Sequence, residues 1–284
     1  MSYLLEVDRL AVTMPDGTRA IDDVSFTVDR GEIVGFIGES GSGKSTTANA
    51  IARLLPEGAT VTGRIMFDDR DVLALGTREL NRFRDVDLGM VFQDPRAAVN
   101  PVARVGEYVT EALRVNRRMS RAAARARAIE LFTEVGIPEP DRRLDEYPHQ
   151  FSGGMLQRAV IAAALSTDPR LLLADEATTA LDVTRQAEVA AILRKACHDR
   201  DLGLVFITHD LELAGALCDR VCVMYRGRIV EQVEADRLHT DATHPYTIAL
   251  LRSRPSVDER SQRLPVITAA DRETFESALE ETSP

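Results

Sequence analysis

The sequence predicts an α/β fold in which a mainly parallel core sheet is covered by helices on both faces. Two observations support this prediction. Short apolar segments that read as buried strands alternate with longer helix-like segments through most of the 284 residues, as in folds whose parallel strands are joined by helices. In addition, the apolar run Ile33–Ile37 leads through a glycine-rich turn into a helix-like segment.

The first third of the chain predicts an antiparallel β subdomain beside this core. Residues 3–12 are mostly apolar and extended, and residues 24–28 alternate apolar with polar side chains, as a half-buried strand does. Residues 63–68 read as a further strand. Between these strands, the segment from Ser45 to about Leu55 predicts the helix that follows the glycine-rich turn.

The middle of the chain predicts an inserted helical subdomain. Residues 102–136 are rich in Ala, Arg, Leu and Glu and have helical spacing. A proline-containing link over 138–148 leads to another helix, from near Ser152 to about Ser166.

The last third returns to alternating strands and helices. Strands are expected over 170–174 and 204–208, a helix over 183–199 and a hairpin over 220–231, before the chain turns polar and acid-rich after Pro255. These elements form one domain over about residues 3–254. Its predicted parts are 1–95, the antiparallel β subdomain with the glycine-rich loop; 96–167, the helical subdomain; 168–255, the rest of the core; and 256–284, an acidic C-terminal tail.

Composition and charge are those of an ordinary soluble globular protein. The net charge of -10 gives no electrostatic support for a nucleic-acid partner. No apolar run approaches the roughly 20 residues that span a bilayer. Residues 1–10 carry Glu6 and Asp8 and lack the basic and then apolar regions of a secretory signal. The three cysteines, Cys197, Cys218 and Cys222, suit packing better than metal binding. We therefore expect a cytoplasmic protein.

The glycine-rich turn is the strongest chemical signal. Residues 38–46 read G-E-S-G-S-G-K-S-T and match the phosphate-binding pattern G-x-x-x-x-G-K-[ST], the P-loop. Backbone N–H groups and the positive end of a helix converge there, which suits a polyphosphate. Lys44 is expected to reach the β- and γ-phosphates and the Ser45 hydroxyl to hold Mg²⁺. The alternative interpretation of the motif is an accidental loop of small residues. The predicted nucleotide-binding residues of the loop are Gly38, Glu39, Ser40, Gly41, Ser42, Gly43, Lys44, Ser45 and Thr46.

Two further segments extend this predicted site. Asp175 ends an apolar strand, where a carboxylate is expected to position Mg²⁺, and Glu176 is placed to orient a water for attack on the γ-phosphate. The alternative is a pair of surface acids in a turn. Ser152, Gly153 and Gly154 read as a helix start that exposes N–H groups to a second phosphate, although this triplet also occurs in ordinary loops.

The order of these motifs resembles that of the ATP-binding-cassette (ABC) ATPases, over about residues 3–254. The resemblance implies a P-loop NTPase fold that binds ATP and Mg²⁺. Taken alone, Gln93 would be a turn residue and His209 a polar residue after a strand. The matching elements are the Walker A loop at 38–46, Gln93 in V-F-Q-D-P, the signature F-S-G-G-M at 151–155, the Walker B strand L-L-L-A-D-E at 171–176, the A-L-D turn at 180–182 and His209 in I-T-H-D.

The resemblance also implies roles for these residues. Glu176 is the catalytic base, Gln93 senses Mg²⁺ and the γ-phosphate and links to a membrane partner, and His209 contacts the γ-phosphate. The remaining residues act between two subunits that sandwich two ATP molecules. Of these, Ser152, Gly153 and Gly154 contact ATP bound to the opposite subunit, and Asp182 signals across the dimer.

A finer resemblance is to the importers of peptides and nickel. It rests on F-Q-D-P-R-A-A-V-N-P at 92–101, V-G-E at 105–107, S-G-G-M-L-Q-R and H-P-Y-T-I-A-L-L at 244–251. Met155 stands where other cassettes have Gln. In this respect the signature resembles that of one of two non-identical ATPase subunits. The implied partners are that second ATPase, two membrane-spanning permease subunits and an extracytoplasmic substrate-binding protein. The chain itself would lie peripherally on the cytoplasmic face of the membrane. Dipeptides, longer peptides, nickel and metal chelates stay open as the transported substrate.

The chain departs from the family pattern in two places. Where the family has an aromatic ring that stacks on adenine, this chain has Met14 and Pro15. A thioether contact with the adenine ring is weaker and less specific than aromatic stacking. No cysteine follows Cys222, so we expect no metal cluster of the kind that some relatives carry in a C-terminal extension. A soluble ABC ATPase of DNA maintenance is one alternative, but the chain has neither heptad arms nor cysteine pairs. A non-catalytic, ATP-gated binding module is another, which the complete catalytic set opposes.

Overall fold

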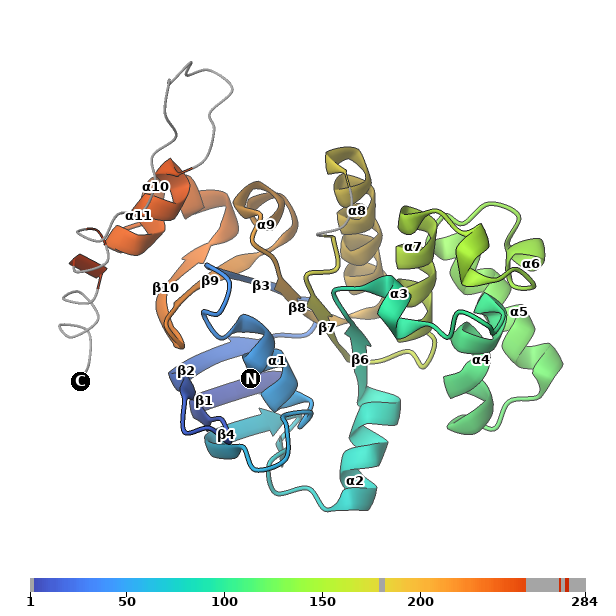
Figure 1. The fold of residues 1–284 in the computed structure, drawn as a ribbon, viewed down its shortest axis with the longest axis horizontal. Helices are drawn as coiled ribbons and strands as arrows, with labels where there is room; N and C mark the ends of the chain where they lie inside the picture. Colours follow the sequence, from blue (N-terminus) through green and yellow to red (C-terminus); the bar gives the residue numbers. More distant parts are fainter. Residues whose placement is uncertain (1–2, 179–181, 254–270, 272–273, 276–284) are drawn as a thin grey trace.

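A six-stranded sheet organises the fold. The computed structural model describes residues 3–178, 182–253, 271 and 274–275 (Figure 1). Every neighbouring pair of strands is parallel except the hairpin at one edge, so the predicted mainly parallel core sheet is confirmed. The strand order is β10 (Arg228–Glu234), β9 (Arg220–Tyr225), β3 (Ile33–Ile37), β8 (Gly203–Ile207), β7 (Leu171–Asp175) and β6 (Leu88–Val91).

Both faces of this sheet are covered by apolar clusters. Successive side chains of a strand point to opposite faces, so each strand contributes to both clusters. In β7, Leu172 packs in one apolar cluster and Leu173 in another. Such strands are buried from both sides and therefore read as continuous apolar runs. The first cluster contains side chains of α7 (Gly153–Ala164), α8 (Val183–Arg200) and α9 (Leu211–Leu217), and the second contains side chains of α1 (Lys44–Ile51).

The predicted antiparallel sheet is also present, and it closes the second cluster. Phe26 of this sheet packs edge-on against Phe36 of β3, with ring centroids 4.8 Å apart. This contact fixes the small sheet against the strand that leads into the P-loop. The strand order is β2 (Arg19–Val28), β1 (Leu5–Thr13), β4 (Thr60–Phe67) and β5 (Arg70–Asp71).

Helices gather at one end of the molecule, as predicted for the middle of the chain (Figure 1). Ser120 caps α5 (Arg121–Glu134) by accepting a hydrogen bond from the Ala123 N–H, and Gly136 ends that region with a φ of +72°. The predicted link over 138–148 contains a short helix of its own. The helices here are α3 (Pro95–Ala98), α4 (Val105–Val115), α5 (Arg121–Glu134), α6 (Pro140–Arg143) and α7, with a 3₁₀ turn at Pro148–Gln150.

The structure differs from the sequence prediction in several short elements. The α1 helix ends at Ile51 rather than near Leu55, because Arg53 adopts a left-handed φ of +53°. Helix α9 was not predicted. Also unpredicted are α2 (Thr77–Arg82) with a π-helical turn at Phe83–Asp87, a 3₁₀ turn at Ala235–Arg237, α10 (Leu238–Asp241) and α11 (Pro245–Arg252).

The three cysteines are buried in the apolar clusters. Cys218 lies in one cluster and Cys222 in the other, on opposite faces of the sheet. Burial raises the pKa of Cys197 and of Cys222 to about 12, which keeps these thiols protonated. Among the described residues, none of the helices has the length and apolar character needed to cross a membrane.

Candidate functional site

The P-loop joins the end of β3 to the start of α1, and its glycines are required by geometry. Gly38 has a φ of +148°, and a Cβ there would lie 2.2 Å from the Met224 carbonyl oxygen. Gly43, the N-cap of α1, has a φ of +107°. A loop this close to neighbouring backbone cannot accept a side chain at Gly38 without moving.

Lys44 lies inside the loop rather than extending into solvent. Its side chain is buried, with 5% of the residue exposed, and its Nζ donates to the Gly38 and Glu39 carbonyl oxygens, each at 2.8 Å. Burial lowers the pKa of Lys44, while the carboxylates of Glu176, Asp175 and Glu39 oppose that shift. The loop therefore holds a cation where a polyphosphate chain would lie.

The loop shares a pocket of about 200 Å³ with two residues from neighbouring strand ends. Gln93 follows β6 and Glu176 follows β7, and the carboxyl ends of parallel strands meet at one edge of a sheet. The pocket is lined by Ala20, Ser40, Gly41, Gly43, Lys44, Ser45, Thr46, Gln93 and Glu176.

Ser45 and Asp175 form a linked pair of oxygen groups at this edge. The Ser45 hydroxyl donates to Asp175 Oδ1 at 2.9 Å. Burial raises the pKa of Asp175, as does the charge of Glu176, whereas the Ser45 hydrogen bond and Lys44 oppose the rise. A hydroxyl beside a carboxylate is a donor set that Mg²⁺ prefers, so the two side chains fit a magnesium ion.

Glu176 lies between an amide and an imidazole. Gln93 Nε2 donates to Glu176 Oε2 at 2.7 Å, and His209 Nδ1 lies 3.9 Å from Glu176 Oε1. The Glu176 N–H donates to the Ile207 carbonyl oxygen at 3.0 Å, and its φ is +47°. The carboxylate is thereby aimed into the pocket, where it can accept a proton from a water.

The signature residues lie elsewhere. Ser152 caps α7 and accepts from the Met155 N–H at 3.3 Å, and Asp182 caps α8 and accepts from the Arg185 N–H at 3.0 Å. In the described part of the chain, Ser152, Gly153, Gly154 and Asp182 do not line the P-loop pocket. Figure 1 shows the start of α7 well apart from α1.

The two helix starts are neighbours of one another. A Cβ built on Gly154 would meet the Arg185 side chain at 3.2 Å, and Arg185 Nε lies 3.3 Å from Asp182 Oδ2. The structure thus brings the signature and Asp182 together, but apart from the P-loop. Ala180 and Leu181 of the predicted A-L-D turn lie outside the described residues.

Two contacts of the site were not predicted from the sequence. Ala20 of β2 lines the P-loop pocket, and the Tyr246 hydroxyl accepts a hydrogen bond from the Glu39 N–H. Met14, which stands where the family has an aromatic ring for adenine, packs against the apolar cluster between the two sheets.

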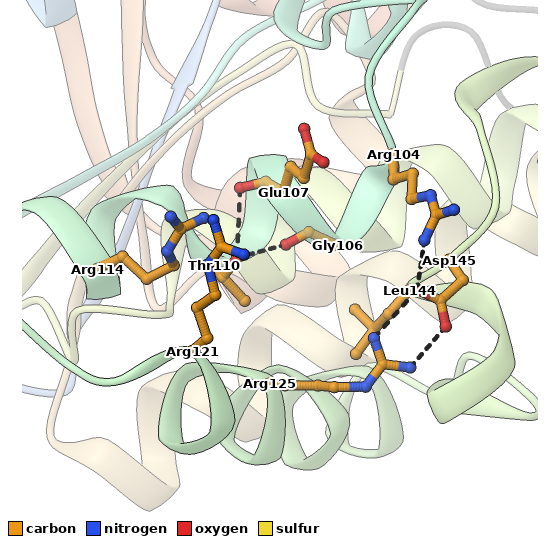
Figure 2. A pocket seen from close by; sticks show the side chains of 9 residues that line it. All are labelled: Arg104, Gly106, Glu107, Thr110, Arg114, Arg121, Arg125, Leu144 and Asp145. Carbon is orange, nitrogen blue, oxygen red and sulfur yellow. Dashed lines mark hydrogen bonds and ion pairs between the residues drawn. The ribbon is translucent and has the colours of Figure 1, made fainter.

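A second pocket, of about 300 Å³, lies in the helical region and is lined by four arginines among other residues (Figure 2). Arg104 and Arg125 both bind Asp145, at 3.2 and 2.7 Å. These contacts tie α4 and α5 to the turn after α6. None of the predicted site residues lines this pocket.

Comparison with known proteins adds to this geometry. A family model described as "ABC transporter" matches residues 21–179. The oligopeptide transport ATP-binding protein OppD of Bacillus subtilis is 44% identical over 267 residues, covering 92% of this chain and 75% of that protein. The OppD of Mycobacterium tuberculosis is 46% identical over 262 residues, covering 91% of this chain but 43% of that longer protein.

Solved structures agree with the fold. An ATP-binding cassette described as dimeric, in a post-hydrolysis state with ADP and Pi, has a TM-score of 0.72 and 30% identity, covering 81% of this chain and 98% of that one. The similar fold, the family match and the shared motif order support the same assignment. This chain belongs to the ABC transporter family as one of its ATP-binding, ATP-hydrolysing members.

Proposed function

We propose that this chain is the ATP-hydrolysing subunit that energises a membrane importer of peptides, nickel or related small solutes. One observation carries the ATPase assignment: Lys44, Gln93 and Glu176 meet in one pocket, although they come from three separate strand ends. Peptide transport is supported by the names of the two relatives described above, which are both oligopeptide transport ATP-binding proteins. The four parts predicted over 1–95, 96–167, 168–255 and 256–284 are proposed as its domain organisation.

The catalytic steps follow from the side chains of the pocket. Lys44 and the loop N–H groups bind the phosphates of ATP, and Ser45, Gln93 and Asp175 would hold Mg²⁺, which neutralises phosphate charge when bound. Glu176 orients a water and accepts its proton as the oxygen attacks the γ-phosphorus. The bond from that phosphorus to the bridging oxygen breaks, and ADP and phosphate leave. His209 is placed to contact the γ-phosphate beside Glu176.

The complete site requires a second subunit. Ser152 and Gly153 are exposed at the start of α7, and neither lines the pocket of their own P-loop. We propose that Ser152, Gly153 and Gly154 contact ATP held by the P-loop of a partner subunit, with Asp182 beside them at the interface. The dimeric form of the similar cassette supports this arrangement.

The remaining partners follow from the same proposal. Met155 favours a second, non-identical ATPase over a second copy of this chain. A cleft of about 350 Å³, lined among others by Met90, Tyr108 and Val115, lies beside α4. We propose that two permease subunits dock at such clefts, on the cytoplasmic face of the membrane, and that a substrate-binding protein joins from the other side.

Glu176→Gln tests the assignment of the catalytic base. The variant keeps an acceptor for the Gln93 amide but cannot accept a proton from water. In an assay together with the partner ATPase, we expect it to bind ATP, to accumulate as a closed dimer with that partner on size exclusion and to hydrolyse ATP about 100-fold more slowly or worse. Glu57→Gln, at an exposed carboxylate, is the matched control. Hydrolysis by Glu176→Gln near the wild-type rate would remove Glu176 from its role.

A further inference from the structure

The start of α11 reaches the P-loop from the far end of the sequence. Tyr246 is fully buried, and its ring lies against Tyr225, with centroids 4.5 Å apart, and against Phe275, at 5.4 Å. The Glu39 N–H donates to the Tyr246 hydroxyl at 2.9 Å. A residue more than 200 positions downstream therefore contacts the second residue of the loop.

Tyr246 is itself held in place by its neighbours. His244 caps α11, because its Nδ1 accepts from the Tyr246 N–H at 3.1 Å, and Pro245 occupies the first turn. Glu231 of β10 accepts from the N–H groups of Thr243, at 2.6 Å, and His244, at 3.2 Å. The segment before α11 is thus fixed to the edge hairpin of the core sheet.

The contact falls on the peptide unit that also holds Lys44. The Gly38 carbonyl accepts from Lys44 Nζ at 2.8 Å, and the N–H of the same peptide unit is the Glu39 N–H. Because the C=O and N–H of a trans peptide point in opposite directions, Lys44 and Tyr246 bind its two sides. Rotating this peptide would break both hydrogen bonds together.

We propose that Tyr246 is a positioning residue for the P-loop, which holds the Gly38–Glu39 peptide in the orientation that keeps Lys44 in place for the phosphates of ATP. The proposal rests on the proposed role of Lys44 in phosphate binding. It assigns a task to the H-P-Y-T motif, in which His244 and Pro245 set the helix start and Tyr246 makes the contact.

The test compares two hydroxyl deletions within one aromatic cluster. Tyr246→Phe removes the acceptor of the Glu39 N–H and keeps the ring. Tyr225→Phe is the matched control, since no residue in the described part of the chain hydrogen-bonds the buried Tyr225 hydroxyl. Lys44→Ala tests the underlying role of the lysine. ATP binding in the presence of Mg²⁺ is measured by calorimetry on the full chain, together with Tm, KM and kcat.

We expect Tyr246→Phe to weaken ATP binding about 2- to 10-fold, the loss of one hydrogen bond, and to raise KM for ATP more than it lowers kcat. Tyr225→Phe should bind ATP within about twofold of wild type by the same reasoning, and both Tm values should stay within about 3 °C. If Lys44→Ala weakens binding and Tyr246→Phe does not, the inference about Tyr246 is wrong and the proposed function stands. If Lys44→Ala binds ATP normally, both are wrong.

Equal weakening by the two phenylalanine variants would also overturn the inference, because it would make packing of the cluster the cause. Hydrogen exchange of the wild-type protein gives a readout that needs no folded variant. The Glu39 amide should exchange slowly, since its partner is buried. Exchange as fast as that of an exposed loop amide would contradict the proposed contact.

Discussion

Replacing Gly38 by alanine is expected to destabilise the protein far more than the same change at Gly41. Both glycines lie in the P-loop at positive φ, +148° and +81°, so both variants suffer the conformational cost of a Cβ in that region, about 1–2 kcal/mol. They differ in space. A Cβ at Gly38 would lie 2.2 Å from the Met224 carbonyl oxygen, whereas at Gly41 none of the described atoms lies within 4 Å.

The steric part of the penalty can be estimated from this distance. Real Cβ atoms essentially never approach closer than 3.0 Å, so the loop or the end of β9 must move. Overpacking of this kind costs about 1–3 kcal/mol. Gly38→Ala should therefore lower the free energy of unfolding by about 2–5 kcal/mol, against about 1–2 kcal/mol for Gly41→Ala.

Urea unfolding followed by circular dichroism measures both losses. Gly153→Ala is a further control, because Gly153 has neither a positive φ nor a described atom within 4 Å of an added Cβ. Equal losses for Gly38→Ala and Gly41→Ala would refute the steric argument. So would a loss at Gly38 no larger than that of the Gly153 control.

Two other predictions concern the C-terminal segment and the partner subunit. Burial lowers the pKa of His244, although Glu231 opposes the shift, so the unfolded protein binds a proton more readily than the folded one, and stability should fall as pH drops below about 6.5. His244→Asn, which keeps a capping acceptor, should lose less stability than wild type between pH 8 and 5.5, and an identical pH profile would contradict this. Purified alone, the chain should hydrolyse ATP poorly, because the Met155 signature favours a non-identical partner; full, transport-coupled activity as a homodimer would rule that out.

Sequence patterns identified the parts of the site that local chemistry encodes. The P-loop has a fixed spacing of Gly, Lys and Ser, and Asp175 and Glu176 follow an apolar run. Parallel strands then bring Glu176 beside Gln93, which is why these two predicted residues line one pocket with the P-loop. Helix α9 was missed because its seven residues are too few to show a clear period.

The contact between Tyr246 and Glu39 could not be predicted in this way. It depends on how the edge hairpin and α11 pack against β3, and no local spacing encodes a pair so distant in sequence. The packing of Met14 could not be predicted from a motif either, because its contact with the apolar cluster is set by the fold of the small sheet.

The left-handed backbone at Glu176, with its φ of +47°, has a consequence for engineering. A glycine there would relax about 1 kcal/mol or more of strain, so the backbone at this position favours a residue that lacks the carboxylate of the proposed catalytic base. Directed evolution for thermal tolerance alone would tend to discard the carboxylate. A selection that also demands turnover is needed to keep it.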